Sequence, residues 1–225
     1  MIIGLIGQKR VGKDTVANII KNINVNLNSN YNFKCMALAE PIKDIARIMF
    51  NFTEEQLYDD AKDIIDTRWG IKPRDFFEQF GTNIMQFDIY KYLSNLETHV
   101  EKRLFWVHSL LAKLKDYEHN KNSNIIVTDI RGLHEVCEIN KFTEGKAIFI
   151  RIIKQMEIDN NNDNNNDNNN NICINNNISS HITQREPNEI PDEYIFNTIN
   201  NNGTLEELKV KVENVWKRIE ITLNK

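Results

Sequence analysis

Apolar positions along the chain follow two periods, one typical of buried strands and the other typical of amphipathic helices. Runs of apolar residues predict strands at 1–6, 33–38, 124–128, 146–153 and 194–199. Helical spacing predicts helices at 13–23, from Pro41, at 53–60, 73–88 and 96–117, from Leu133, and from Thr204 onward. Because strands alternate with helices, the expected fold class is α/β, with a mostly parallel sheet covered by helices on both faces.

Two of these helices have a clear apolar face. The helix after Pro41, a proline suited to a first helical turn, is expected to bury Ile42, Ile45, Ala46 and Met49. The last helix opens with a capping box, Thr204 to Glu207, and is expected to bury Leu205, Leu208, Val212, Val215 and Ile219. The stretch between the second and third strands is predicted to be a mostly helical layer.

Composition narrows the function classes. The 225 residues carry 28 Lys+Arg and 32 Asp+Glu, a formal net charge of −4, and no long basic block, so we expect no nucleic-acid partner. No apolar run reaches the roughly 18 residues that span a bilayer, and no secretion signal is recognised. Three scattered cysteines favour a reducing, cytoplasmic location. We expect a single domain, 1–225, interrupted by a disordered insertion at about 159–177, where asparagine dominates.

A phosphate-binding motif follows the first predicted strand. Gly7-Gln-Lys-Arg-Val-Gly12-Lys13-Asp14-Thr15 matches G-x-x-x-x-G-K and lies between a strand and a helix, as this motif requires. Glycines let successive backbone N–H groups turn toward phosphate oxygens, and the positive end of the helix dipole reinforces them. Lys13 adds a charge for the outer phosphates. The loop predicts a nucleotide site.

The residues that would hold a metal ion are left open at this point. Asp14 stands where the general motif has the Ser or Thr that binds Mg²⁺, so either Asp14 or the neighbouring Thr15 could take that role. Asp14 could instead only favour the helix N-terminus through its charge. Asp129, at the end of the third predicted strand, is the second candidate for metal or phosphate, with a turn or helix cap as its alternative.

Phosphoryl transfer depends on cations around the migrating group. The candidates are Lys9, Arg10, Lys43, Arg74 and Arg131. Arg131 follows the carboxyl end of a strand, where open α/β sheets bind ligands, and Lys43 lies in the first turns of the helix after the second strand.

These motifs together resemble the phage-type deoxynucleoside monophosphate kinases, a branch of the P-loop kinases. The loop is similar to that family's G-x-K-R-x-G-K-D-T, including the aspartate at Asp14. Similar blocks follow along most of the chain: Leu38-Ala-Glu40-Pro-Ile-Lys43-Asp44, where Glu40 replaces a glycine, Arg74 with Phe80-Gly81-Thr82, Trp106, Asp129-Ile-Arg131 with Glu135, His181-Ile-Thr183, and Asn201-Asn-Gly-Thr-Leu-Glu-Glu-Leu208.

The resemblance implies a P-loop kinase fold with a helical acceptor or lid region, in a protein of viral origin. It implies transfer of the ATP γ-phosphoryl group to a dNMP with Mg²⁺, in host cytoplasm, by a chain that could form a homodimer. Gly7, Lys9, Arg10, Gly12, Lys13, Asp14 and Thr15 would bind ATP and metal. Arg10 and Arg131 would stabilise the transferred group.

The same resemblance implies the acceptor site. Lys43, Arg74 and Arg131 would hold the acceptor phosphate, and Asp129 and Glu135 would orient metal, cations or sugar. Leu38, Gly81, Thr82 and Trp106 would contact the acceptor nucleotide. Two alternatives stay open: a phosphomevalonate-kinase-like enzyme, whose loop is also similar, and a nucleotide-binding regulator without turnover.

Overall fold

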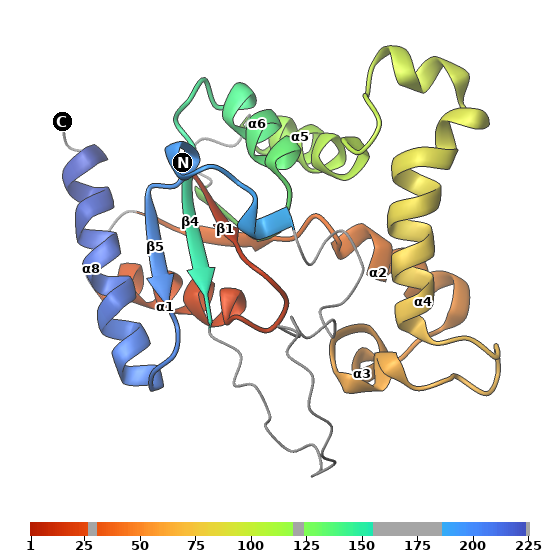
Figure 1. Cartoon of the computed structure of the whole chain (residues 1–225), viewed down its shortest axis with the longest axis horizontal. Helices are drawn as coiled ribbons and strands as arrows, with labels where there is room; N and C mark the ends of the chain where they lie inside the picture. Colours follow the sequence, from red (N-terminus) through yellow and green to blue (C-terminus); the bar gives the residue numbers. More distant parts are fainter. Residues whose placement is uncertain (27–30, 119–123, 155–185, 224–225) are drawn as a thin grey trace, which may run out of the picture.

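The computed structural model describes residues 1–26, 31–118, 124–154 and 186–223 (Figure 1). The Asn-rich stretch 159–177 and the match at His181-Ile-Thr183 lie outside the described residues. At the centre is a five-stranded parallel sheet in the order β2-β3-β1-β4-β5. Its strands are β1 (Ile2–Ile6), β2 (Phe33–Met36), β3 (Asn124–Ile130), β4 (Ile148–Ile153) and β5 (Asn197–Asn200). The predicted α/β class with a parallel sheet is confirmed.

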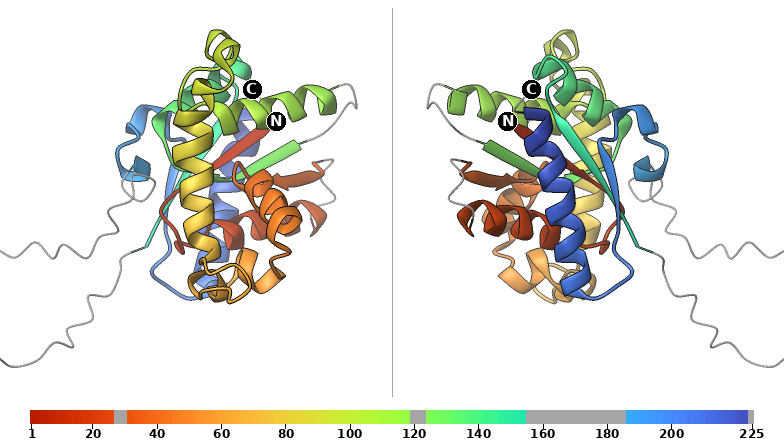
Figure 2. Two further views of the ribbon diagram at one scale, coloured as in Figure 1. Left: turned by 90° about the vertical axis from the view of Figure 1, so that its right-hand side faces the viewer. Right: turned by 90° about the vertical axis from the view of Figure 1, so that its left-hand side faces the viewer.

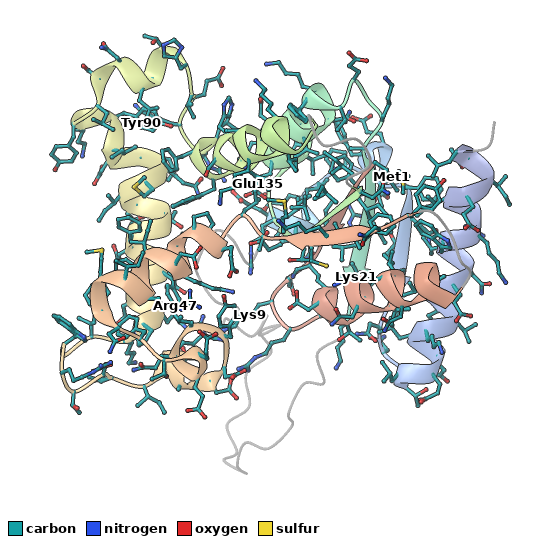
Figure 3. All side chains as sticks on the ribbon, turned by 180° about the vertical axis from the view of Figure 1, so that it is seen from behind. Met1, Lys9, Lys21, Arg47, Tyr90 and Glu135 are labelled. Carbon is teal, nitrogen blue, oxygen red and sulfur yellow. The ribbon has the colours of Figure 1, made fainter. Side chains whose placement is uncertain are left out.

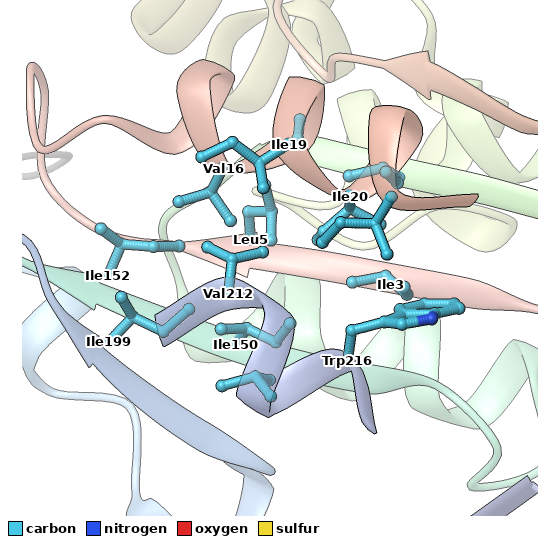
Figure 4. Packing of buried hydrophobic residues seen from close by; sticks show 14 of the residues in the cluster. Ile3, Leu5, Val16, Ile19, Ile20, Ile150, Ile152, Ile199, Val212 and Trp216 are labelled. Atoms are coloured by element: carbon cyan, nitrogen blue, oxygen red, sulfur yellow. The ribbon is translucent and has the colours of Figure 1, made fainter. Parts of the chain in front are cut away.

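One face of the sheet is covered by α1 (Lys13–Asn26) and α8 (Leu205–Leu223), which contribute to one hydrophobic cluster. Figure 4 shows Val16 and Ile20 of α1 and Val212 and Trp216 of α8 packed over Ile3 and the strands beside it. Trp216 is 1% exposed, and its ring meets Phe33 of β2 edge to face. Burying an aromatic side chain of this size contributes on the order of 2–3 kcal/mol to the stability of the fold. Trp216 therefore helps to hold α8 against α1 and the sheet.

The opposite face is covered by α5 (Phe105–Glu118) and α6 (Leu133–Phe142). Alternate residues of β3 serve the two faces: Ile126 packs in the α1 and α8 cluster, whereas Ile125 and Val127 pack in the α5 and α6 cluster. A strand buried on both faces needs apolar side chains on both, which is why Ile125, Ile126 and Val127 form an unbroken β-branched run.

A helical region stands to one side of the sheet (Figures 1 and 2). It contains α2 (Glu40–Phe50), α3 (Glu54–Tyr58), the 3₁₀ helix η1 (Asp60–Asp63) and α4 (Pro73–Glu78), which continues as the π-helical segment η2 (Gln79–Phe87). The 3₁₀ helices η3 (Asp88–Lys91) and η4 (Ser94–Thr98) complete it. A small separate core of Ala46, Phe52 and Leu57 lies inside this region. The predicted helical layer between β2 and β3 is therefore present.

Several predicted boundaries differ from the structure. The helix predicted at 96–117 begins at Phe105, because Arg103 has a left-handed φ of 72° that separates it from η4. β5 begins at Asn197, since a 3₁₀ helix, η6 (Asp192–Tyr194), occupies the start of the predicted strand.

Two residues predicted to be buried are exposed. Met49 is 56% exposed, because the inward stripe of α2 runs through Ile42, Ala46 and Phe50 instead. Leu205 is 58% exposed, since it lies in the first turn of α8, ahead of Leu208, the first buried residue of that helix. Among the described residues, no helix is both long and apolar enough to cross a membrane.

Candidate functional site

The loop from Gly7 to Lys13 joins β1 to α1 at the carboxyl edge of the sheet. Gly12 has a φ of +96°, and a Cβ added there would lie 2.4 Å from Nδ2 of Asn201. A Cβ at Gly7 would lie 2.5 Å from the carbonyl oxygen of Ile152 in β4. Both positions therefore need glycine, one for its backbone conformation and both for the close approach of neighbouring atoms. The glycine spacing of the motif follows from this geometry.

Lys13, the first residue of α1, folds back over the loop. Its Nζ donates hydrogen bonds to the carbonyl oxygens of Gly7 (2.8 Å) and Gln8 (2.6 Å), and the residue is only 8% exposed. Burial lowers the pKa of Lys13 to about 8, and the positive charge of Arg131 acts in the same direction. The negative charges of Asp129 and Asp14 oppose this shift in the pKa of Lys13. The structure thus brings four of the predicted site residues around one ammonium group.

Asp129 lies near the end of β3, the strand next to β1. The register changes at this point: Gly4 pairs with Val127, but Ile6 pairs with Ile130, so β3 has one extra residue. The carboxylate of Asp129 accepts hydrogen bonds from the backbone N–H groups of Leu38 (2.7 Å) and Ala39 (2.9 Å). Asp129 therefore ties the segment that leads from β2 into α2 to the end of β3.

Glu135, in the first turn of α6 (Leu133–Phe142), also binds backbone N–H groups. Its Oε2 accepts hydrogen bonds from the backbone N–H groups of Arg131 (2.7 Å) and Gly132 (3.1 Å), which fixes the start of α6. The side chain is 14% exposed. Burial raises the pKa of Glu135 to about 7, outweighing the two backbone hydrogen bonds, which lower it. Glu135 thus holds the backbone that carries Arg131.

The cations on the other side of the loop are paired with carboxylates of η1. Arg10, which has a φ of 65°, donates from Nη2 to Asp60 (2.5 Å). Arg74, in the first turn of α4, donates from Nε and Nη2 to the two carboxylate oxygens of Asp63. Burial lowers the pKa of Lys9, and the charge of Arg74 is the next largest cause. Lys9 therefore lies in the same group of charges, between the helical region and α1 (Figure 3).

Lys43 lies within α2 and is held from two sides. Its Nζ is 3.6 Å from the carboxylate of Glu40 and 3.9 Å from the centre of the Tyr58 ring. The hydroxyl of Tyr58 donates to the same Glu40 (2.5 Å). Glu40, the residue that stands where the resembling family has glycine, thus connects Lys43 to α3.

Gly81 and Trp106 are in contact next to Ile42 of α2. The indole Nε1 of Trp106 donates to the carbonyl oxygen of Gly81 (2.6 Å), and a Cβ on Gly81 would lie 2.7 Å from Cδ1 of Ile42. Trp106 is 6% exposed, so this hydrogen bond is shielded from solvent. Thr82 is half-buried beside Gly81.

A cavity of about 540 Å³ lies beside β2, the edge strand of the sheet. Leu38 and Trp106, both predicted to contact the acceptor nucleotide, line it. Its other walls come from β2, from the N-terminal turn of α2 and from α5: Lys34, Cys35, Met36, Ala37, Glu40, Pro41, Leu110 and Lys113.

The family model for deoxynucleotide monophosphate kinase matches residues 1–92. The matched segment, 92 of the 225 residues, is similar to the deoxynucleotide monophosphate kinase family. It includes the phosphate loop, Lys43, Arg74 and Gly81-Thr82, and the match supports the family and the kinase function predicted from the sequence. No curated protein matches the chain.

The remaining predicted site residues lie beyond the matched segment. The family match does not cover Trp106, Asp129, Arg131 and Glu135. In the fold, Asp129 and Arg131 lie close enough to Lys13 to act on its charge, and Trp106 contacts Gly81 of the matched segment. The individual roles assigned to all the site residues stay predictions.

The donors around Lys13 fit a magnesium ion that is bound mainly through nucleotide phosphates. Asp14 is exposed in the first turn of α1 and Thr15 is half-buried, while Asp14 and Asp129 both act on the charge of Lys13. In the part of the chain that the structure describes, no three His, Cys, Asp or Glu side chains form a metal cluster. Mg²⁺ commonly needs only one or two carboxylates when phosphates and water supply the other ligands, so the chemistry of this donor set is suitable.

Sequence reasoning missed three contacts at the site. Asn201, in the β5–α8 connection, donates from Nδ2 to the carbonyl oxygen of Val11 (2.9 Å) and so braces the phosphate loop. Asp60 and Asp63 pair with Arg10 and Arg74. Asn201 stands in a block that resembles the family, but nothing in that block indicates a contact with the loop 190 positions away. No local motif marks Asp60 or Asp63 as a partner of an arginine.

Proposed function

We propose that the protein transfers the γ-phosphoryl group of ATP to a deoxynucleoside monophosphate, in the presence of Mg²⁺, to give ADP and dNDP. The observation that carries this proposal is the contact between two elements of opposite roles. Arg10 of the phosphate loop reaches Asp60 of η1, in the helical region that also holds Arg74. A nucleotide on the loop would therefore face an acceptor held by the helical region.

The donor side binds ATP through backbone groups and Lys13. The loop N–H groups and the N-terminus of α1 would surround the phosphates, and the ammonium of Lys13 would turn from the carbonyl oxygens of Gly7 and Gln8 to the outer phosphate oxygens. Mg²⁺, when bound, would neutralise phosphate charge, with Asp14 or Thr15 and Asp129 as the residues that could hold it.

The acceptor side orients the second nucleotide. Lys43, Arg74 and Arg131 would bind its phosphate, while Leu38 and Trp106 offer apolar walls for its base in the cavity beside β2. Arg10 and Arg131 would stabilise the negative charge of the group in transfer, as positioned cations do in phosphoryl-transfer sites. Little covalent chemistry is required of the protein, so positioning and charge carry most of the rate enhancement.

An ADP-release assay tests this function directly. The full-length protein is given Mg-ATP and, in parallel, dTMP, dGMP, dCMP, dAMP, their ribonucleotide forms and phosphomevalonate. Turnover with one or more deoxynucleotides is expected. Turnover with phosphomevalonate alone would overturn the acceptor assignment, and ATP binding without any turnover would replace the enzyme by a nucleotide-binding regulator.

A further inference from the structure

The 3₁₀ helix η1 places two carboxylates against the two arginines of the site. Asp60 pairs with Arg10 of the phosphate loop (2.5 Å), and Asp63 pairs with Arg74 of α4. η1 thus lies between the element that would bind the donor and the element that would bind the acceptor.

Four cationic side chains gather around η1. Besides the two arginines, Lys62 of η1 and Lys9 of the loop belong to this group, because the pKa of each lysine is lowered first by burial and next by the charge of Arg74. Lys62 donates a hydrogen bond from Nζ to the carbonyl oxygen of Tyr58 (3.0 Å). Asp60 and Asp63 pair with the arginines, and Asp75 and Glu78 also act on the charge of Arg74. Four cationic groups so close together offer several donors to an anion such as a phosphate monoester.

The geometry of the Asp63 pair leaves part of Arg74 available. Asp63 accepts from Nε and Nη2, which lie on one edge of the planar guanidinium. The donors on Nη1 point along a different edge. A carboxylate that grips one edge of an arginine fixes the direction of the other donors, which reduces the entropy lost when a phosphate binds to them.

We propose that η1 completes the acceptor-phosphate site: Asp63 is a positioning residue that orients Arg74, and Lys62 is an additional phosphate-binding residue. This inference rests on the proposed function, since it deepens the acceptor site of that reaction.

Steady-state kinetics with Mg-ATP and the best deoxynucleotide acceptor tests the two residues. The series is the wild-type protein with Asp63→Asn, Lys62→Met, Arg74→Met, and Asp63→Asn combined with Arg74→Met. The matched control is Asp59→Asn, which makes the same charge change at an exposed neighbouring position. Calorimetric titration of each protein with the dNMP alone measures acceptor binding without turnover, and thermal melting reports folding.

The expected result is a split between the two substrates. Asp63→Asn and Lys62→Met each raise KM and Kd for the dNMP about tenfold, while KM for ATP and kcat stay within about twofold, because only ground-state acceptor contacts are lost. The double variant is no worse than Arg74→Met alone, since Asp63 acts through Arg74. Asp59→Asn behaves like the wild type.

Other outcomes overturn the inference. An unchanged KM for the dNMP in Asp63→Asn, or additive losses in the double variant, removes Asp63 as a positioning residue, and an unchanged KM in Lys62→Met removes Lys62. If Asp63→Asn does not fold, Arg74→Lys decides the point, because lysine keeps the charge but cannot form the two-point pair. The Arg74→Lys protein must show the same rise in KM for the dNMP. A wild-type KM for the dNMP in this variant would refute the role of Asp63. A wild-type protein that neither binds nor phosphorylates any dNMP overturns the proposed function itself.

Discussion

Charged side chains at the ends of β1 and β3 are held by backbone groups, whereas those between the phosphate loop and η1 are held by other side chains. Lys13 donates to two loop carbonyl oxygens, Asp129 accepts from two backbone N–H groups, and Glu135 accepts from two more. In the second region Arg10 and Asp60 bond to each other with side chains that are 68% and 89% exposed.

The difference concerns which contacts a substrate can replace. The backbone partners of Asp129 and Glu135 directly flank the ends of strands and helices in the packed sheet, so these two carboxylates have little freedom. An exposed ion pair contributes little net stability, because solvent and salt screen it. Arg10 can therefore exchange the carboxylate of Asp60 for a substrate phosphate at low cost.

Replacing Lys13 tests the first region most strongly. Lys13→Ala is expected to lower kcat at least about a hundredfold while the protein stays folded, because it removes a charge that stabilises the group in transfer. The measurement is kcat with Mg-ATP and a dNMP, next to circular dichroism. Lys21→Ala, an exposed lysine on the same helix, is the control and should keep wild-type turnover. A folded Lys13→Ala protein with near-normal kcat would contradict the loop assignment.

The buried carboxyl of Glu135 predicts a pH dependence of stability. Its pKa is raised from 4.5 to about 7 in the folded state, so its contribution to stability is complete below pH 4.5 and is lost as the pH rises through 7. Glu135→Gln removes the titration and keeps an oxygen to accept the backbone N–H groups. Between pH 5 and pH 8 the wild type should lose roughly 2–3 kcal/mol of unfolding free energy relative to Glu135→Gln.

Urea unfolding of both proteins across this pH range measures the effect. Parallel stability curves would mean that Glu135 titrates near its ordinary pKa and that its enclosure does not disfavour the charge.

Asp129→Asn tests whether a carboxylate bound to backbone N–H groups contributes more to stability than one in an exposed ion pair. An asparagine has one oxygen for the N–H groups of Leu38 and Ala39, and its amide NH₂ would face the other donor. We expect a loss of about 1.5 kcal/mol in unfolding free energy and a higher KM for the acceptor, because α2 is no longer anchored. Asp88→Asn, at an exposed pair with Lys91, is the control and should change neither value. Wild-type stability in Asp129→Asn would show that the two regions do not differ in this respect.

The smallest effect is expected for Asp60. Asp60→Asn should change the unfolding free energy by less than about 0.5 kcal/mol, because its pair with Arg10 is exposed. Thermal and urea unfolding at low and high salt measure this change. A loss above about 1.5 kcal/mol would reveal a structural clamp and remove the contrast between the two regions.

Much of the fold could be predicted because its signals are local. The unbroken apolar run of β3, the glycine spacing of the loop and the capping box of α8 each depend on residues within a few positions of one another. The failures came where a distant neighbour decides. Met49 and Leu205 have the right period for burial, but no element in the described part of the chain covers either of them.

The sequence by itself determined a strand, a phosphate loop and a helix, the residue types that bind phosphate, and the similarity of the first 92 residues to a kinase family. Only the tertiary structure decided what those residues contact. Arg10 meets Asp60 across 50 positions, Leu38 meets Asp129 across 91, and Val11 meets Asn201 across 190. Such contacts depend on strand order and on the register of β3, and neither is encoded in a short stretch of chain, because pairing between distant segments is settled only when the whole sheet and its covering helices pack together.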